Sequence, residues 1–262
     1  MNKSEWFFTA DWHLGHGNII KYCKRPFLSK EQLEICDLIT KGLVPQNSFS
    51  VPPEAIEKMN HAIINNTNDV VRENDNLVIL GDFCFTKGSD KLSQVAEFRK
   101  QIACKNVFFI CGNHDSKEIC SKVFTACYDN YLFKIDGQYV FTSHYPARSW
   151  DRASHGAWML YGHVHNQLYK EDNGLLSEYD ERVLSDGFYS VLQRYGIKVS
   201  SQEIVTDLLS VCSSLNGVNL TLDVGVDNTS RNVPFGTPWS MTEIRDYMKP
   251  KILLWQNRNS NR

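Results

Sequence analysis

The chain repeats one pattern: a short apolar run that ends abruptly in a polar cluster. Five runs show it, namely WFFTA before DWH, NLVIL before GDF, NVFFIC before GNHD, QYVFTS before HYP and AWMLY before GHVH. Runs this short, rich in Val, Ile and aromatic residues, predict buried strands. Helical patterns separate the strands of the first 110 residues. Alternation of strands and helices predicts an α/β sheet, whose polar clusters then share one edge.

Local patterns add detail to this prediction. Residues 54–66 and 90–102 carry apolar residues at helical spacing, with Ser89 as the predicted N-cap of the second helix. Residues 131–142 predict a hairpin, because Asp136-Gly137 suits a type I′ turn. The stretch LTLDVGV at 220–226 predicts a further strand.

The same reading predicts one domain over residues 1–250. Residues 37–53 read as a loop over the sheet edge. Residues 168–217 read as an inserted helical cap, with helices expected at 183–194 and 201–215. Residues 251–262 are expected to form a disordered tail, because the end of the chain is polar.

Composition narrows the class of protein. The 262 residues are 42% hydrophobic and 22% charged, which is ordinary for a globular protein, and the net charge of −2 argues against a dedicated nucleic-acid surface. No apolar run approaches the roughly 20 residues that span a bilayer, and the N-terminus lacks the apolar core of a signal peptide. The eight cysteines form no CxxC pair, so free thiols in a reducing cytoplasm are expected.

The polar clusters supply a set of metal-ligand side chains, namely Asp11, His13, Asp82, Asn113, His114, His144, His163 and His165. Carboxylate, amide and imidazole groups without a thiolate suit Mn, Fe or Zn ions. The set exceeds the needs of one metal. Two metals about 3.5–4 Å apart with a bridging carboxylate would use nearly all of it, and that arrangement serves displacement at phosphorus.

Each cluster alone has a plainer interpretation. Asp after Gly is common in turns, GNHD can form a simple turn, and a single His144 would usually be structural. Five clusters at five strand ends favour a metal centre jointly. Cys84 is interpreted as a core or rim residue.

Four other polar residues stay open between two interpretations. His16 and Asn18 are candidates for substrate contacts, and Asn18 is equally the N-cap of a following helix. Arg25 and Arg148 are candidates for binding a substrate phosphate, with a solvated surface role as the alternative.

The order D-x-H, G-D, G-N-H-D, H, G-H-x-H resembles the calcineurin-like metallophosphoesterase superfamily over residues 4–168 and 218–245. DWHLGHGNIIKYCKRPF and the later LDVGVD further resemble small phosphoesterases of bacteria and phages, and DWHLG is similar to the Mre11/SbcD nucleases. The resemblance implies a four-layer αββα sandwich around two central mixed sheets. Residues 168–217 are longer than this family pattern expects, so the resemblance assigns them no role.

The resemblance also implies residue roles. Asp11, His13 and His165 would hold one metal, and Asn113, His144 and His163 the other, with Asp82 bridging both. His114 would contact phosphate and protonate the leaving oxygen, with Asp115 orienting it. A hydroxide that bridges the metals would attack phosphorus.

The function expected from the sequence is therefore hydrolysis of phosphate monoesters or diesters, with a small or nucleotide-like substrate and two divalent ions, Mn being the most suitable in vitro. A metal-dependent nuclease of the Mre11/SbcD type is the first alternative. A non-catalytic metal-binding scaffold is the second, and the intact ligand set argues against it. No membrane partner is expected, and the oligomeric state stays open.

Overall fold

The computed structural model describes residues 4–167, 194 and 220–260. The chain divides into two compact units, residues 1–166 with 221–245, and residues 167–220 with 246–262. One domain over residues 1–250 with an inserted segment at 168–217 stays a prediction. All the predicted site residues belong to the first unit. The predicted helical cap at 168–217 lies outside the described residues, apart from Arg194.

Two mixed sheets form the centre of the first unit, as predicted. One has the order β4-β3-β2-β1-β9 and the other the order β5-β6-β7-β8. β9 runs antiparallel to β1, and β5 antiparallel to β6, while the remaining pairs are parallel. The strands are β1 (Trp6–Thr9), β2 (Asn76–Leu80), β3 (Asn106–Ile110), β4 (Ala126–Tyr128), β5 (Asn130–Ile135), β6 (Gln138–Ser143), β7 (Trp158–Tyr161), β8 (Thr221–Asp223) and β9 (Trp239–Ser240).

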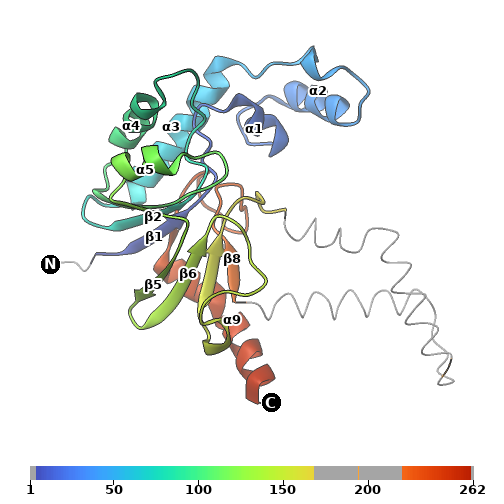
Figure 1. Ribbon diagram of the computed structural model, residues 1–262. Helices are drawn as coiled ribbons and strands as arrows, with labels where there is room; N and C mark the ends of the chain where they lie inside the picture. The colour runs from blue at the N-terminus through green and yellow to red at the C-terminus, as the bar shows by residue number, and fades with distance from the viewer. Residues whose placement is uncertain (1–3, 168–193, 195–219, 261–262) are drawn as a thin grey trace. The chain divides into compact units, whose positions relative to one another are not determined.

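Helices connect the strands of the first sheet. The described helices are α1 (Gly17–Tyr22), α2 (Lys30–Thr40), α3 (Pro53–Val70), α4 (Lys91–Lys100), α5 (Lys117–Val123) and α9 (Met241–Ser260), with short 3₁₀ turns η1 (Gln46–Ser48) and η2 (Ala153–His155). Figure 1 shows α3, α4 and α5 on one side of β1 and β2, and the second sheet on the other. None of the helices in the described part of the chain combines the length and apolarity that crossing a membrane requires.

Alternation along the strands builds both faces of the first sheet. Phe7, Leu77 and Val107 belong to one buried cluster with residues of the covering helices, such as Met59 of α3. Residues one step along the strands face the opposite way. Phe108 accordingly has its ring centroid 5.9 Å from that of Phe133 in β5 and joins the two sheets. At the start of α9, Arg245 donates a 3.2 Å hydrogen bond to Asp136 in the β5–β6 turn.

Three local predictions need correction. α2 extends to Thr40, into the segment 37–53 that reads as a loop, and it begins at a reciprocal capping box of Ser29 and Gln32. Asp90, not Ser89, is the N-cap of α4, and its carboxylate accepts a hydrogen bond from the backbone N–H of Ser93. Residues 251–260 continue α9 where a disordered tail is predicted, since most of them are compatible with a helix.

The β5–β6 hairpin agrees with its prediction. Asp136 and Gly137 both have positive φ, 48° and 87°, as a type I′ turn requires. The register pairs Ile135 with Gln138 across this two-residue turn. The turn therefore fixes β6 in the register that leads to His144.

Candidate metal centre

The predicted ligands lie where the strands end, and the backbone there is strained. Left-handed φ angles between 48° and 72° occur at five of the seven predicted ligands, Asp11, His13, Asp82, His163 and His165. Such a conformation costs a non-glycine residue about 1–3 kcal/mol and persists where the surroundings enforce it. Strained backbone conformations that occur together at one set of polar residues are typical of a functional site.

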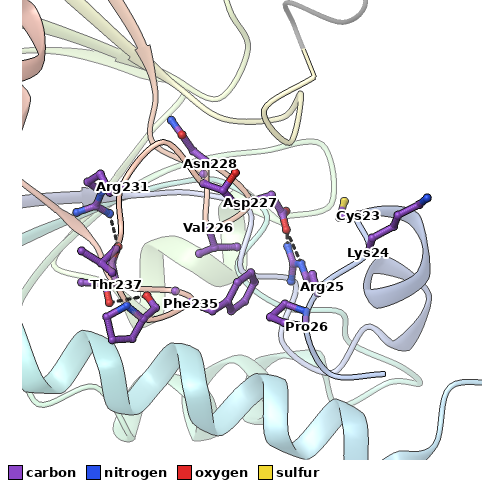
Figure 2. A pocket seen from close by; sticks show the side chains of 15 residues that line it. Cys23, Lys24, Arg25, Pro26, Val226, Asp227, Asn228, Arg231, Phe235 and Thr237 are labelled. Atoms are coloured by element: carbon purple, nitrogen blue, oxygen red, sulfur yellow. Dashed lines mark hydrogen bonds and ion pairs between the residues drawn. The ribbon is translucent and has the colours of Figure 1, made fainter. Parts of the chain in front are cut away.

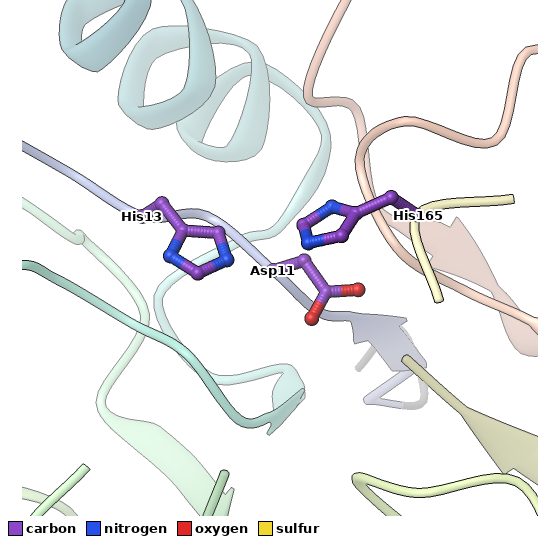
Figure 3. A group of neighbouring side chains, drawn as sticks. All are labelled: Asp11, His13 and His165. Carbon is purple, nitrogen blue, oxygen red and sulfur yellow. The ribbon is translucent and has the colours of Figure 1, made fainter. Parts of the chain in front are cut away.

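The first group of ligands comprises Asp11, His13 and His165, whose ligand atoms lie within 4.8 Å of one another. Figure 3 shows the three side chains converging, and the two imidazole centroids are 5.2 Å apart. Nε2 of His13 is buried and has no hydrogen-bond partner among the described residues. Burial, with help from Arg25, lowers the pKa of His13, so its imidazole is neutral and its lone pair is available. This buried lone pair fits a cation.

The second group comprises Asp82, His144 and His163, again within 4.8 Å. The Nδ1–H of His144 donates to the carbonyl oxygen of Leu80 at 2.8 Å, which leaves the lone pair on Nε2. That nitrogen lies 3.0 Å from Oδ1 of Asn113. Two acceptor atoms facing each other repel unless a cation lies between them, so the second group also fits a metal ion.

Asp82 is a member of the second group and also lies beside the first. Its Oδ2 lies 3.5 Å from Nε2 of His13 and 3.5 Å from Nε2 of His144. One carboxylate oxygen is therefore equally distant from an imidazole of each group. This is the position that a carboxylate bridging two metal ions requires.

Gly81 makes room for this arrangement. It precedes Asp82 with a φ of +88°, and a Cβ atom there would lie 2.3 Å from Nδ1 of His144. A side chain would therefore displace the imidazole as well as strain the backbone. The close packing of the β2 end against His144 needs glycine at this position.

Asp115 has a different role from the one predicted. Its Oδ2 accepts hydrogen bonds from the backbone N–H groups of Asp82, at 2.7 Å, and Gly112, at 2.8 Å. Its Oδ1 accepts a third from Phe83 at 3.2 Å. The carboxylate therefore ties the loop after β2 to the loop after β3. Because both oxygens are committed to backbone amides, the interpretation that Asp115 orients the His114 imidazole is corrected.

Asn113 and His114 lie at the mouth of the centre, and both residues are exposed. The His114 ring centroid is 5.4 Å from that of His13. Its backbone N–H donates to Oδ1 of Asp82 at 3.1 Å, so the oxygen that does not face the imidazoles is held by this loop. His114 is thus anchored by its backbone while its side chain faces solvent.

Arg25 lies in the interior, where a substrate phosphate cannot reach it. Its guanidinium forms a two-point ion pair with Asp227, at 2.9 and 2.8 Å, shown in Figure 2. It also donates to the carbonyl oxygens of Asp11, at 2.7 Å, and Trp12, at 2.9 Å. The hypothesis that Arg25 binds substrate is therefore corrected, because its side chain is fully buried and its donors are engaged.

The other three candidate substrate residues differ in their distance from the ligands. His16 stacks on Phe85 with ring centroids 4.6 Å apart and lies 5.6 Å from His13, so it borders the centre. Asn18 is exposed inside α1, and the N-cap position belongs to His16, which corrects the N-cap alternative for Asn18. Arg148 is exposed on the segment that follows β6.

Two acids at the end of β8 support the centre and were not among the predicted site residues. Asp227 accepts a 2.7 Å hydrogen bond from Nδ1–H of His165. Asp223 accepts the backbone N–H of Asn166, at 2.8 Å, and so holds the loop that carries His165. The rule that located the other clusters, acids at the end of a strand, also applies to LDVGVD.

The electrostatics of His165 follow from these neighbours. Burial lowers the pKa of His165, but hydrogen bonds with Asp227 and Cys23 outweigh it and raise the pKa to about 11. Cys23, His165 and Asp227 also form a third group of ligand atoms within 4.8 Å. Because Asp227 is already paired with Arg25, we interpret this third group as support for His165 rather than as a separate metal site.

Comparison with known proteins agrees with the fold. The model of the calcineurin-like phosphoesterase family matches residues 7–207, and the chain belongs to that family. Membership identifies it, in general terms, as a metal-dependent phosphoesterase.

Two relatives extend the comparison. An uncharacterized protein of Methanocaldococcus jannaschii is 28% identical over 165 residues, 63% of this chain and 72% of that protein. The crystal structure of a protein of unknown function from Aquifex aeolicus matches with a TM-score of 0.51 and 16% identity, over 93% of this chain and 99% of the other. The second likeness concerns the fold.

Proposed function

We propose that the protein hydrolyses phosphate monoesters or diesters of small or nucleotide-like molecules at a centre of two divalent metal ions. The observation that supports this most is the position of Asp82, whose Oδ2 is 3.5 Å from an imidazole nitrogen of each ligand group. A shared carboxylate is characteristic of centres in which two ions act on one phosphoryl group.

The two groups divide the ligands. Asp11, His13 and His165 hold one ion, and Asn113, His144 and His163 hold the other, with Asp82 shared. Oxygen and imidazole ligands suit Mn, Fe or Zn, and Mn²⁺ is the ion we expect to be most effective in vitro. When bound, the ions lower the pKa of water for attack at phosphorus and neutralise charge on the phosphoryl oxygens.

His114 supplies the proton for the leaving group in this proposal. Its imidazole is exposed, while its backbone is fixed through Asp82, so it can approach an ester oxygen bound at the mouth of the centre. A leaving alkoxide is a strong base and needs a proton as the bond to phosphorus breaks. His16 lies on the same side of the centre as His13 and is a candidate for contact with the substrate.

A nuclease of the Mre11/SbcD type is the second candidate, supported by the DWHLG stretch. The net charge of −2 disfavours it, because phosphate-backbone binding depends on basic side chains. The complete ligand set disfavours a non-catalytic scaffold. We place the protein in the cytoplasm, since the described cysteines are free thiols.

The test is a substrate panel with metal-stripped and Mn²⁺-loaded protein. The panel contains p-nitrophenyl phosphate, its bis ester, cyclic nucleotides, and single- and double-stranded DNA. We expect metal-dependent hydrolysis of at least one small ester and loss of that activity in Asp82→Asn. Cleavage of DNA without turnover of small esters would favour the nuclease. Failure on the whole panel with both metals bound would favour the scaffold.

A further inference from the structure

We propose that the buried Arg25–Asp227 ion pair is a positioning device for the first metal group, fixing Asp11 and His165 relative to each other. The inference rests on the proposed metal centre and adds two residues that neither bind metal nor touch substrate. The pair joins two segments far apart in the sequence, the loop that follows α1 and the loop that follows β8.

The Asp227 end controls an imidazole. Its Oδ2 accepts the Nδ1–H of His165 at 2.7 Å and also pairs with Nη2 of Arg25 at 2.8 Å. A proton held on Nδ1 leaves Nε2 as the ligand atom and fixes the ring plane. His165 has a left-handed φ of 48°, an unfavourable backbone conformation. The hydrogen bond with Asp227 holds its side chain in place and helps to stabilise this conformation.

The Arg25 end controls a stretch of backbone. Nη2 donates to the carbonyl oxygen of Asp11 at 2.7 Å, and Nη1 donates to that of Trp12 at 2.9 Å. Asp11 has a left-handed φ of 58°, and its carboxylate accepts the backbone N–H of His163 at 2.9 Å with each oxygen. The Arg25 guanidinium therefore holds the strained backbone of Asp11, a proposed metal ligand. It also pairs with Asp227, the acid that orients the imidazole of His165, a second proposed ligand.

Burial argues against a purely structural role for the pair. The side chains of Arg25 and Asp227 are 0% and 5% exposed. Apolar residues of similar volume often replace a buried ion pair without loss of stability, so a retained pair needs a further reason. Its hydrogen bonds lead to Asp11 on one side and His165 on the other, which supplies that reason.

The same unit contains a control pair with similar hydrogen bonds but less burial, since the side chains of Arg231 and Glu243 are 12% and 39% exposed. Arg231 pairs with Glu243 at 2.9 Å and donates to the carbonyl oxygens of Thr237, at 2.6 Å, and Pro238, at 3.1 Å. This arginine also bonds one carboxylate and two backbone carbonyls, but none of these partners is a predicted metal ligand. A general effect of losing an arginine–carboxylate pair would appear in both places.

The experiment compares Asp227→Asn with Glu243→Gln. An amide has one acceptor oxygen, so the side chain of the Asp227→Asn variant cannot serve both Arg25 and His165. Calorimetric titration of chelator-stripped protein with Mn²⁺ should show one of the two binding events weakened about 10- to 100-fold in Asp227→Asn and the other unchanged. Glu243→Gln should keep both affinities, and circular dichroism should verify that each variant is folded.

Arg25→Lys provides a second variant that keeps the buried charge but loses the fork of donors. It should weaken the same binding event, and it decides the question if Asp227→Asn does not fold. A folded variant that shows wild-type Mn²⁺ affinity in both binding events, or equal weakening of both binding events, would overturn the inference. A wild-type protein that binds fewer than two ions would instead refute the proposed centre itself.

Discussion

Side chains that follow one another in the sequence have separate tasks in this site. Asn113 faces the second ligand group, His114 faces solvent, and Asp115 turns inward to three backbone amides. The tight turn after β3 allows this divergence. The GNHD motif thus provides a proposed metal ligand, a proposed acid and a structural clamp in three successive residues.

His114→Gln should separate proton donation from metal binding. If His114 protonates the leaving oxygen, kcat/KM on an alkyl or nucleoside ester should fall by roughly 10²–10⁴-fold, with both metals retained. The loss on a p-nitrophenyl ester should be much smaller, because nitrophenolate leaves without a proton. Equal losses on the two esters would indicate phosphate binding, and loss of a metal would make His114 a ligand.

Asp115→Asn should act through the backbone. The amide cannot accept all three N–H groups, so the free energy of unfolding should fall by about 1–3 kcal/mol in urea titrations. Metal affinity should fall as well, because Asp115 holds the peptide of the shared ligand Asp82. Unchanged stability with a loss confined to esters of poor leaving groups would restore the role of orienting His114.

The sequence predicted which residues belong to the site better than it predicted which residues they contact. The strand-end pattern located the ligands that the structure groups together, because the carboxyl ends of strands meet at one edge. The role of Arg25 was missed, since its partner Asp227 is 202 positions away and only the fold brings them together. A charged residue in a motif does not reveal whether it faces substrate or the interior.

At the scale of elements, the ends of the strands determine the geometry. Most strands and the β5–β6 hairpin follow from apolar runs and turn residues, which are local signals, whereas the short strands β4 and β9 were not predicted. The start of α4 was predicted one residue early, because capping depends on single hydrogen bonds, and α2 and α9 were not predicted as helices. Element type is encoded over several residues, whereas an element boundary depends on one or two.

Gly81→Ala tests the packing of the β2 end. The added Cβ would meet both Nδ1 of His144 and the backbone of Gly112, so metal affinity and stability should both fall. Gly88→Ala is the matched control, since Gly88 also has a positive φ, +75°, but a Cβ atom at this position would have nothing within 4 Å. The control should show only the backbone cost of about 1 kcal/mol. Equal effects in thermal melts and metal titrations would contradict the close-packing argument.

At the scale of the whole molecule, metal binding should depend on pH. The pKa of His165 is raised to about 11 in the metal-free protein, so a proton competes with the metal for its imidazole near neutral pH. The affinity of one ion should therefore rise by about tenfold per pH unit between about pH 6 and 8, with proton release on binding. Calorimetry in buffers of different ionisation enthalpy measures both quantities. An affinity independent of pH would contradict a protonated His165.

The general architecture was predictable because strand–helix alternation and the motif order leave few arrangements of the sheets. The division of the chain was not predicted in full, because the second unit combines residues 167–220 with 246–262. No local pattern links segments so far apart. The sequence does not name the substrate either, since the ligand set recognises a phosphoryl group and not the rest of the molecule.

Metal stoichiometry and affinity in Asp82→Asn, compared with Asn113→Ala, show whether two metal ions share Asp82. Elemental analysis and Mn²⁺ titration of the wild type should give about two ions per chain. Asp82→Asn should weaken both binding events together, because its Oδ2 is 3.5 Å from an imidazole of each group, and Asn113→Ala should weaken mainly one. A fully active wild type with one ion, or Asp82→Asn that binds two ions with wild-type affinity, would contradict the account.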